Sequence, residues 1–137
     1  MEPDELAFHS LEAVLELHDL VTKKPGTPKG VRDPEKLRSA LGAVQQSAYY
    51  GDPDLFDIAA AYAFYLAERQ PFVEGNKPTG WMAADGFLKA NGIRADFAQD
   101  RVEQWMVDLG THKLDRHALA QAMREDFEEA WSREKDL

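Results

Sequence analysis

The stretch Glu74-Gly75-Asn76-Lys77 combines residue types that bind a phosphate group at the start of a helix. The first backbone N–H groups of a helix have no internal partner and lie at the positive end of its dipole, so anions bind there. Gly75 lets the backbone approach a phosphate closely, and Lys77 adds a positive charge. Glu74 offers a carboxylate to Mg²⁺, which takes few carboxylates and keeps its waters. The stretch predicts a phosphate site, and the alternative is an ordinary turn between two helices.

The segments on both sides of this stretch are predicted to be helices. Residues 52–69 are apolar on most sides, so their helix belongs in the middle of the domain. Pro71 ends this helix, because the residue before a proline is steered out of the helical region. A second helix covers about residues 77–91, and Gly92 ends it. Phe72, between the two helices, is predicted to anchor the loop to the core.

Four further helices are predicted from N-capping residues followed by apolar positions at helical spacing. The expected caps are Ser10, Asp33 before Pro34, Asp100 with Glu103 as a capping box, and Asp115. No run of alternating β-branched residues indicates a strand. The sequence therefore predicts an all-α fold of six helices in a single domain over residues 1–137, with frayed ends at 1–7 and 132–137.

Composition narrows the classes of function. The chain has 137 residues, enough for one domain with a core, and no cysteine, which rules out disulfides and thiolate metal sites. The net charge of -9, from 25 acidic and 16 basic residues, argues against a dedicated nucleic-acid binder, because phosphates repel such a surface. No apolar run is long enough to span a bilayer, and the N-terminal residues lack a signal-peptide pattern. We expect a cytoplasmic protein that binds neither nucleic acid nor membrane directly.

Residues 71–77, PFVEGNK, resemble the central motif of the Fic/Doc superfamily. That motif reads His-x-Phe-x-Asp/Glu-Gly/Ala-Asn, then Gly or Lys, then Arg. Lysine after the asparagine, here Lys77, is the form of the Doc (death-on-curing) branch. Other segments resemble Doc proteins in the same order: SLEAVLELHD at 10–19, GVRD at 30–33, LRSAL at 37–41, the apolar helix 55–68 and FLKANG at 87–92. The resemblance covers roughly residues 8–92.

This resemblance implies a six-helix Fic/Doc fold and a toxin of a toxin–antitoxin module. Doc toxins transfer phosphate from a nucleoside triphosphate to a hydroxyl of elongation factor Tu and so block translation. An antitoxin inhibits them through a disordered segment that folds on binding. Carried onto this chain, the resemblance implies that Glu74 holds Mg²⁺ and that Gly75, Asn76 and Lys77 bind the phosphates of the nucleotide.

The resemblance also implies a flap that docks a segment of the target protein by strand addition. The flap is assigned to the polar stretch before Asp52, which has no clear helical period. Its residues are Gln45, Gln46, Ser47, Ala48, Tyr49 and Tyr50. The inhibitory motif that some Fic proteins carry within their own chain is missing here, so inhibition would require a separate partner.

Two positions depart from the family motif. Gln70 stands where the family has the histidine that takes the proton from the target hydroxyl, and Pro78 stands where it has a phosphate-binding arginine. General-base catalysis typically contributes roughly 10² to 10⁴-fold. A glutamine amide accepts no proton near neutral pH, and a proline offers neither a guanidinium nor an N–H. Two hypotheses follow: an impaired phosphotransferase, or a catalytically dead binding module that engages a nucleotide, an antitoxin or a target.

The four histidines, His9, His18, His112 and His117, all lie away from the loop in sequence. His18 falls on an apolar stripe and is predicted to be an interior helix residue. His112 and His117 flank a predicted helix cap and are expected to be solvated. The sequence alone therefore indicates no substitute for the missing base.

Overall fold

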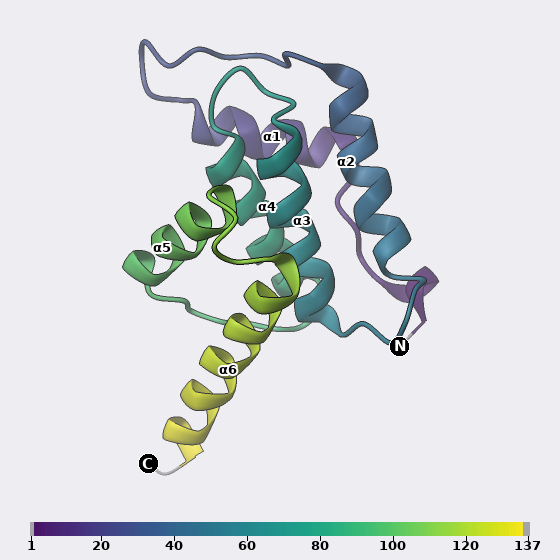
Figure 1. Cartoon of the computed structure of the whole chain (residues 1–137), viewed down its shortest axis with the longest axis vertical. Helices are drawn as coiled ribbons and strands as arrows, with labels where there is room; N and C mark the ends of the chain where they lie inside the picture. Colours follow the sequence, from purple (N-terminus) through teal and green to yellow (C-terminus); the bar gives the residue numbers. More distant parts are fainter. Residues whose placement is uncertain (1, 136–137) are drawn as a thin grey trace.

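Helix α3 (Leu55–Arg69) forms the centre of the fold, and α2, α4, α5 and α6 all contact it (Figure 1). The computed structural model describes residues 2–135, which form six α-helices and no β-strand. Nine of the 15 residues of α3 are buried. The prediction of an all-α fold around a central apolar helix is confirmed. No helix in residues 2–135 has both the length and the apolar character needed to cross a membrane.

The remaining helices follow the predicted order along the chain. A short 3-10 turn, η1 (Pro3–Glu5), precedes α1 (Leu11–Val21), α2 (Pro34–Ser47), α4 (Asn76–Ala90), α5 (Gln99–Gly110) and α6 (Arg116–Lys135). Helix α4 packs closely on α3 because small residues meet there. A Cβ atom at Gly80 would lie 3.0 Å from the carbonyl oxygen of Ala63. This close contact lets the first half of α4 lie directly against the middle of α3.

The helix caps agree with the sequence prediction at three helices and correct it at two. Ser10, Asp33 and Asp115 accept backbone N–H groups of α1, α2 and α6, respectively. Helix α3, predicted to begin at about residue 52, begins at Leu55 and is capped by Asp54, because Asp54 and Asp57 form a reciprocal capping box. The capping box predicted from Asp100 and Glu103 is wrong. Asp100 lies inside the first turn of α5, whose N-cap is Ala98, and Phe97 just before it packs on Trp105.

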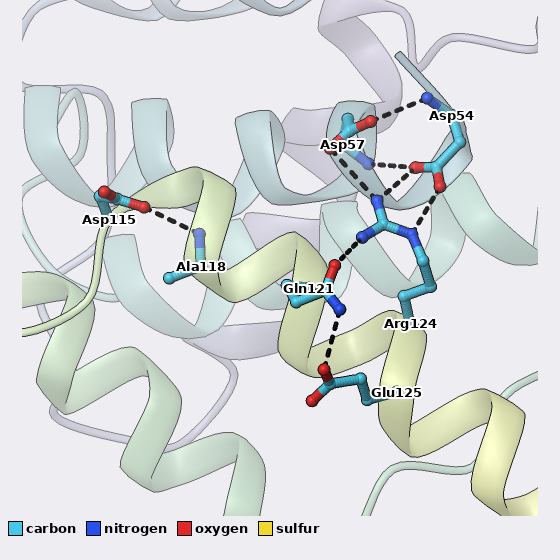
Figure 2. Close-up of polar contacts among 7 residues, drawn as sticks. All are labelled: Asp54, Asp57, Asp115, Ala118, Gln121, Arg124 and Glu125. Carbon is cyan, nitrogen blue, oxygen red and sulfur yellow. Dashed lines mark hydrogen bonds and ion pairs between the residues drawn. The ribbon is translucent and has the colours of Figure 1, made fainter.

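Arg124 on α6 binds two carboxylates at the N-terminus of α3 (Figure 2). The Arg124 guanidinium donates to both carboxylate oxygens of Asp54, at 2.7 and 3.0 Å, and to Asp57 at 3.3 Å. Burial raises the pKa of Asp54, but hydrogen bonds from Arg124 and the Asp57 backbone outweigh it, so this pKa lies below its ordinary value. The C-terminal part of α6 extends beyond the other helices (Figure 1).

The two chain ends predicted to be frayed are described only at residues 2–7 and 132–135. There the chain forms the η1 turn and the last turn of α6. Residues 1 and 136–137 lie outside the described part. Behind the N-terminal turn, the His9 backbone N–H donates to the Tyr62 hydroxyl at 2.9 Å, and burial raises the pKa of Tyr62 to about 12.

Candidate phosphate-binding site

A pair of stacked aromatic rings holds the loop between α3 and α4 against α1. Phe72 is 1% exposed and stacks on His18, with ring centroids 3.8 Å apart and an interplanar angle of 9°. His18 is itself 2% exposed, and its Nε2 lies 2.8 Å from the carbonyl oxygen of Glu74. Since a carbonyl oxygen only accepts, Nε2 carries the proton. His18 is an interior helix residue, as its place on the apolar stripe of α1 predicts.

The Asn76 side chain closes the loop. Its Oδ1 accepts from the Phe72 N–H at 2.9 Å, and its Nδ2 donates to the Phe72 carbonyl at 3.0 Å. The resemblance assigned this amide to phosphate binding. In the structure, one N–H and one lone pair of the amide already serve the loop backbone. Asn76 therefore holds the loop in shape, and its role in phosphate binding stays a prediction.

Gly75 occupies a position that other residues fill only with strain. It is the N-cap of α4 with φ of 81°, in the left-handed region that favours glycine. A Cβ atom there would lie 2.9 Å from Cγ1 of Val21 and 3.4 Å from Cγ2 of Thr22. The loop therefore sits directly against α1, and this contact brings the N-terminus of α4 to the surface of the bundle.

A hollow of about 270 Å³ opens at this helix N-terminus. Ala67 and Gln70 line it from α3, and Glu74, Gly75, Asn76, Lys77 and Pro78 line it from the loop and α4. The first turn of α4 contains no acidic residue, so no carboxylate of that turn competes with an anion. Pro78 lacks an N–H and removes one of the four donors that a helix start normally offers. The hollow suits a phosphate group, with one donor fewer than usual.

Glu74 is the carboxylate at the rim of this hollow, and its side chain is exposed. Within residues 2–135, no three His, Asp or Glu side chains are gathered to hold a metal ion. Mg²⁺ in nucleotide sites needs no such group, because it takes one or two carboxylates together with phosphate oxygens and waters. The single carboxylate of Glu74 beside a helix N-terminus fits that donor set.

Gln70 ends α3 in a strained backbone conformation. Its φ and ψ are 49° and 57°, in the left-handed region, and its side chain is exposed. The Arg32 guanidinium donates to the Gln70 carbonyl at 2.6 Å. Gln70 lines both the 270 Å³ hollow at the α4 N-terminus and the smaller hollow on the α5 side.

Lys77 extends from the start of α4 to the end of α5. A Cβ atom at Gly110 would lie 2.8 Å from its Cε and 3.0 Å from its Nζ. The ammonium therefore lies over the last residue of α5, where the carbonyl end of a helix favours a cation. Lys77 lines the phosphate-sized hollow and also a second, smaller hollow on the α5 side.

Comparison with known proteins identifies the family of this site. The model of the Fic/DOC family matches residues 8–88, which include α1, the loop and most of α4. The chain belongs to the Fic/Doc family. It is 40% identical over 94 residues to Toxin Doc of Mycolicibacterium smegmatis (strain ATCC 700084 / mc(2)155), covering 66% of this chain and 72% of that protein. It is 28% identical over 116 residues to "Protein kinase doc" of Escherichia phage P1, covering 84% and 91% of the two chains.

The residues that the sequence prediction assigned to the Fic/Doc flap form the end of a helix and the turn that follows it. The last turn of α2 contains Gln45, Gln46 and Ser47. The chain then continues in a turn through Ala48, Tyr49 and Tyr50. In this turn the Ala48 N–H donates to the Gln45 carbonyl and the Tyr49 N–H donates to the Gln46 carbonyl. Strand addition requires unpaired backbone groups along an extended edge, so this stretch does not supply one. Gln46, Ser47 and Tyr50 instead line a separate hollow of about 450 Å³.

The extended segment beside the Fic/Doc loop is the one at residues 30–33, before α2. Val31 forms an antiparallel bridge with Phe72, and the N–H groups of Arg32 and Asp33 both donate to the Pro71 carbonyl, at 2.7 and 3.0 Å. Figure 1 shows the α1–α2 and α3–α4 connections at the same end of the molecule. No local pattern in GVRD, residues 30–33, indicates that this segment lies beside the loop.

His112 also lies near the loop, although the sequence separates it from Gln70. It lines the smaller hollow, of about 160 Å³, together with Gln70 and Lys77. His112 is exposed, as expected. The histidines do lie away from the loop in sequence, but the fold brings His18 beneath it and places His112 in a hollow with Gln70. Periodicity along the chain carries no signal for this long-range contact.

Proposed function

We propose that this Fic/Doc protein binds the phosphates of a nucleoside triphosphate at the N-terminus of α4 and slowly transfers phosphate to a hydroxyl of elongation factor Tu. The observation that carries the proposal is the hollow of about 270 Å³ at that N-terminus, with an acid-free first turn and Lys77 in its wall. The similarity to Toxin Doc and to a protein named as a kinase supports phosphate transfer.

The residues of this chain contribute positioning and charge to such a reaction. The N–H groups at the start of α4 and the Lys77 ammonium stabilise the phosphate oxygens, where negative charge is spread during transfer. Mg²⁺, when held by Glu74, neutralises further phosphate charge. The Asn76–Phe72 hydrogen bonds and the close contact of Gly75 with α1 hold the loop rigid, so the donors need no rearrangement.

Two residues make the proposed reaction slow. Gln70 stands at the motif position of the base and accepts no proton, and Pro78 supplies neither a guanidinium nor an N–H. The loss of a base alone corresponds to roughly 10² to 10⁴-fold in rate. The same two residues support the alternative proposal, in which the protein binds a nucleotide, an antitoxin or a target and modifies none of them.

The proposed regulatory partner is an antitoxin whose disordered segment folds on binding. Exposed apolar side chains on the two paired segments beside the loop support this proposal: Val31 is 37% and Val73 47% exposed. A folding segment that covers them would bury apolar surface next to the phosphate site, and burial of this kind stabilises such complexes. Expressing the protein with and without a neighbouring candidate antitoxin gene, then measuring co-purification and growth, tests this partner.

The deciding experiment measures nucleotide binding and phosphate transfer separately. Calorimetry with Mg²⁺ and ATP or GTP should detect binding that Lys77→Ala weakens. Transfer of labelled γ-phosphate to elongation factor Tu should be slow in the wild type. It should rise by about 10²-fold or more when Gln70→His and Pro78→Arg are combined. The two changes serve one transition state, so the double variant should exceed the product of the single ones.

Two results would contradict the proposal in different ways. A folded protein that binds no nucleotide at millimolar concentration excludes the phosphate site. A double variant that binds nucleotide but transfers nothing to elongation factor Tu excludes this target or this reaction, and supports the binding module. Because binding and transfer are measured on the same preparations, the two failures are distinguishable.

A further inference from the structure

The turn between α5 and α6 places a histidine across a small hollow from Gln70. The hollow has a volume of about 160 Å³, and its walls include Glu68, Gln70, Lys77, Gly110 and His112. These residues come from α3, α4, α5 and the turn after α5. A volume of this size admits a side-chain hydroxyl with some water, since one water occupies about 30 Å³ in the liquid.

The backbone holds His112 in a conformation that side chains rarely adopt. Its φ is 62°, and it lies two residues after the end of α5, a place where glycine is the usual residue. The N–H groups of Lys113 and Leu114 both donate to the Asp108 carbonyl, at 2.8 and 3.1 Å, and so close this turn. A glycine at position 112 would satisfy the same turn without strain. Strain of this kind, kept at a residue that lines a hollow, points to a function of the side chain.

The other three histidines lie elsewhere in the fold and contact other groups. The His9 ring bonds the Ala83 carbonyl at 2.8 Å and packs on Tyr62. His18 is buried under the loop and bonds the Glu74 carbonyl. His117 lines the separate hollow of about 450 Å³. Of the four, His112 is the one that shares a hollow with both Gln70 and Lys77.

We infer that His112 is the general base of the phosphate transfer proposed above and stands in for the histidine that Gln70 replaces. This inference rests on the proposed function. Lys77 lines both hollows, so a phosphate bound at the start of α4 lies next to a hydroxyl held in the smaller one. His112, on the turn after α5, can then take the proton of that hydroxyl, which Gln70 at the motif position cannot accept.

The step balances without any further reactant. A neutral ring nitrogen of His112 takes the proton of the target hydroxyl while the hydroxyl oxygen forms a bond to the γ-phosphorus. The bond from that phosphorus to the oxygen bridging to the β-phosphate breaks, and its electron pair leaves with the nucleoside diphosphate. The imidazolium then releases its proton to water. Glu68 from α3 and Lys77 from α4 are the charged residues that share the hollow with this ring.

His112→Asn is the sharpest test, because asparagine tolerates the left-handed conformation but takes no proton. His117→Asn is the matched control, since it removes a histidine from the other hollow. His112→Asn should lower transfer to elongation factor Tu by about 10-fold or more, while His117→Asn leaves it unchanged. Nucleotide affinity by calorimetry should stay the same in both variants.

Restoring the motif base separates a chemical role from a structural one. In a Gln70→His background, His112→Asn should change the transfer rate less than about 2-fold, because the reaction no longer depends on His112. The wild-type rate should rise with pH and level off as one imidazole loses its proton, and this rise should vanish in His112→Asn. A residue that only supports the fold would affect both backgrounds alike and leave the shape of the pH profile unchanged.

Each remaining outcome is decisive. If His112→Asn transfers as fast as the wild type, or slows both backgrounds equally, His112 is not the base. If the wild type is inert while Gln70→His is active, this inference fails and so does the proposed slow transfer by the wild type, whereas the nucleotide site and the target stand. If Gln70→His binds nucleotide but transfers nothing, the proposed function fails and the inference falls with it.

Discussion

The α3–α4 loop has an underside, which packs against α1, and an outer face, which is exposed to solvent. The two differ in how many of their groups make contacts within the protein. On the underside, Phe72 stacks on His18, Asn76 makes two hydrogen bonds to the Phe72 backbone, and Gly75 touches α1. On the outer face, Gln70 and Pro78 are exposed and border open hollows. The two faces belong to the same few residues of chain, yet one is close-packed and the other is open to solvent.

This difference explains how the loop keeps its shape with Gln70 and Pro78 at the two positions that depart from the family motif. A buried, hydrogen-bonded residue is expensive to replace because its partners lose their contacts as well. An exposed residue at the rim of a hollow can change with little effect on stability. Gln70 and Pro78 are therefore compatible with the packed loop, although Pro78 removes one backbone N–H from the start of α4. The following predictions test this separation, from the largest effect on stability to the smallest.

Phe72→Ala should have the largest effect. Removing a ring that is 1% exposed and stacked on His18 should lower the free energy of unfolding by about 3–5 kcal/mol. Urea denaturation followed by circular dichroism measures this loss. The neighbouring Val73, 47% exposed, is the matched control, and Val73→Ala should cost less than about 0.5 kcal/mol. Similar losses of unfolding free energy in the two variants would contradict the difference between the packed underside and the exposed outer face of the loop.

Gly75→Ala should destabilise by about 2–4 kcal/mol, since it combines an unfavourable left-handed backbone with a clash. The new Cβ would lie 2.9 Å from Cγ1 of Val21. Gly92→Ala is the control, because φ there is 93° but nothing lies within 4 Å of the added atom. The difference between the two variants isolates the contact with α1, and Val21→Ala should relieve part of it. Equal losses at both glycines would mean that α1 gives way easily.

Asn76→Ala should cost about 1–3 kcal/mol, because the N–H and the carbonyl of Phe72 both lose their partner. Amide hydrogen exchange gives the more specific measurement. Exchange of the Phe72 N–H should accelerate in this variant, while the N–H groups in the middle of α3 keep their protection. Unchanged exchange at Phe72 would show that the loop keeps its shape without the Asn76 side chain.

Local patterns in the sequence predicted most of the fold. Periodicity and capping placed six helices in order, and Pro71 correctly ended the central one. The errors lay at the helix ends: α3 begins three residues later than the predicted residue 52, because Asp54 and Asp57 form a capping box there. Residues 45–47 gave no helical period because they are polar, yet they form the last turn of α2.

The candidate site was less predictable, because long-range contacts complete it. The residues of the loop itself were identified from their types and order. His112 and Arg32 come from turns that reach the loop only after α5 and α2 have packed on α3. A sequence pattern of 3.6 residues per turn reports which face of a helix is buried. It does not report which turn of one helix lies beside the end of another.

The smallest predicted effect has the opposite sign and lies five residues before Gly75. Gln70 has φ of 49°, and its exposed side chain accounts for none of the loop's hydrogen bonds, since Arg32 bonds its backbone carbonyl. In Gln70→Gly, relief of the left-handed conformation, about 1–2 kcal/mol, exceeds the extra freedom of glycine in the unfolded chain, about 0.5–1 kcal/mol. Urea denaturation should therefore show a gain of about 0.5 kcal/mol. Glu68→Gly, inside α3, should instead lose about 1 kcal/mol. A loss at both positions would mean that the Gln70 side chain stabilises the fold, and that the outer face is not free to vary as we argue.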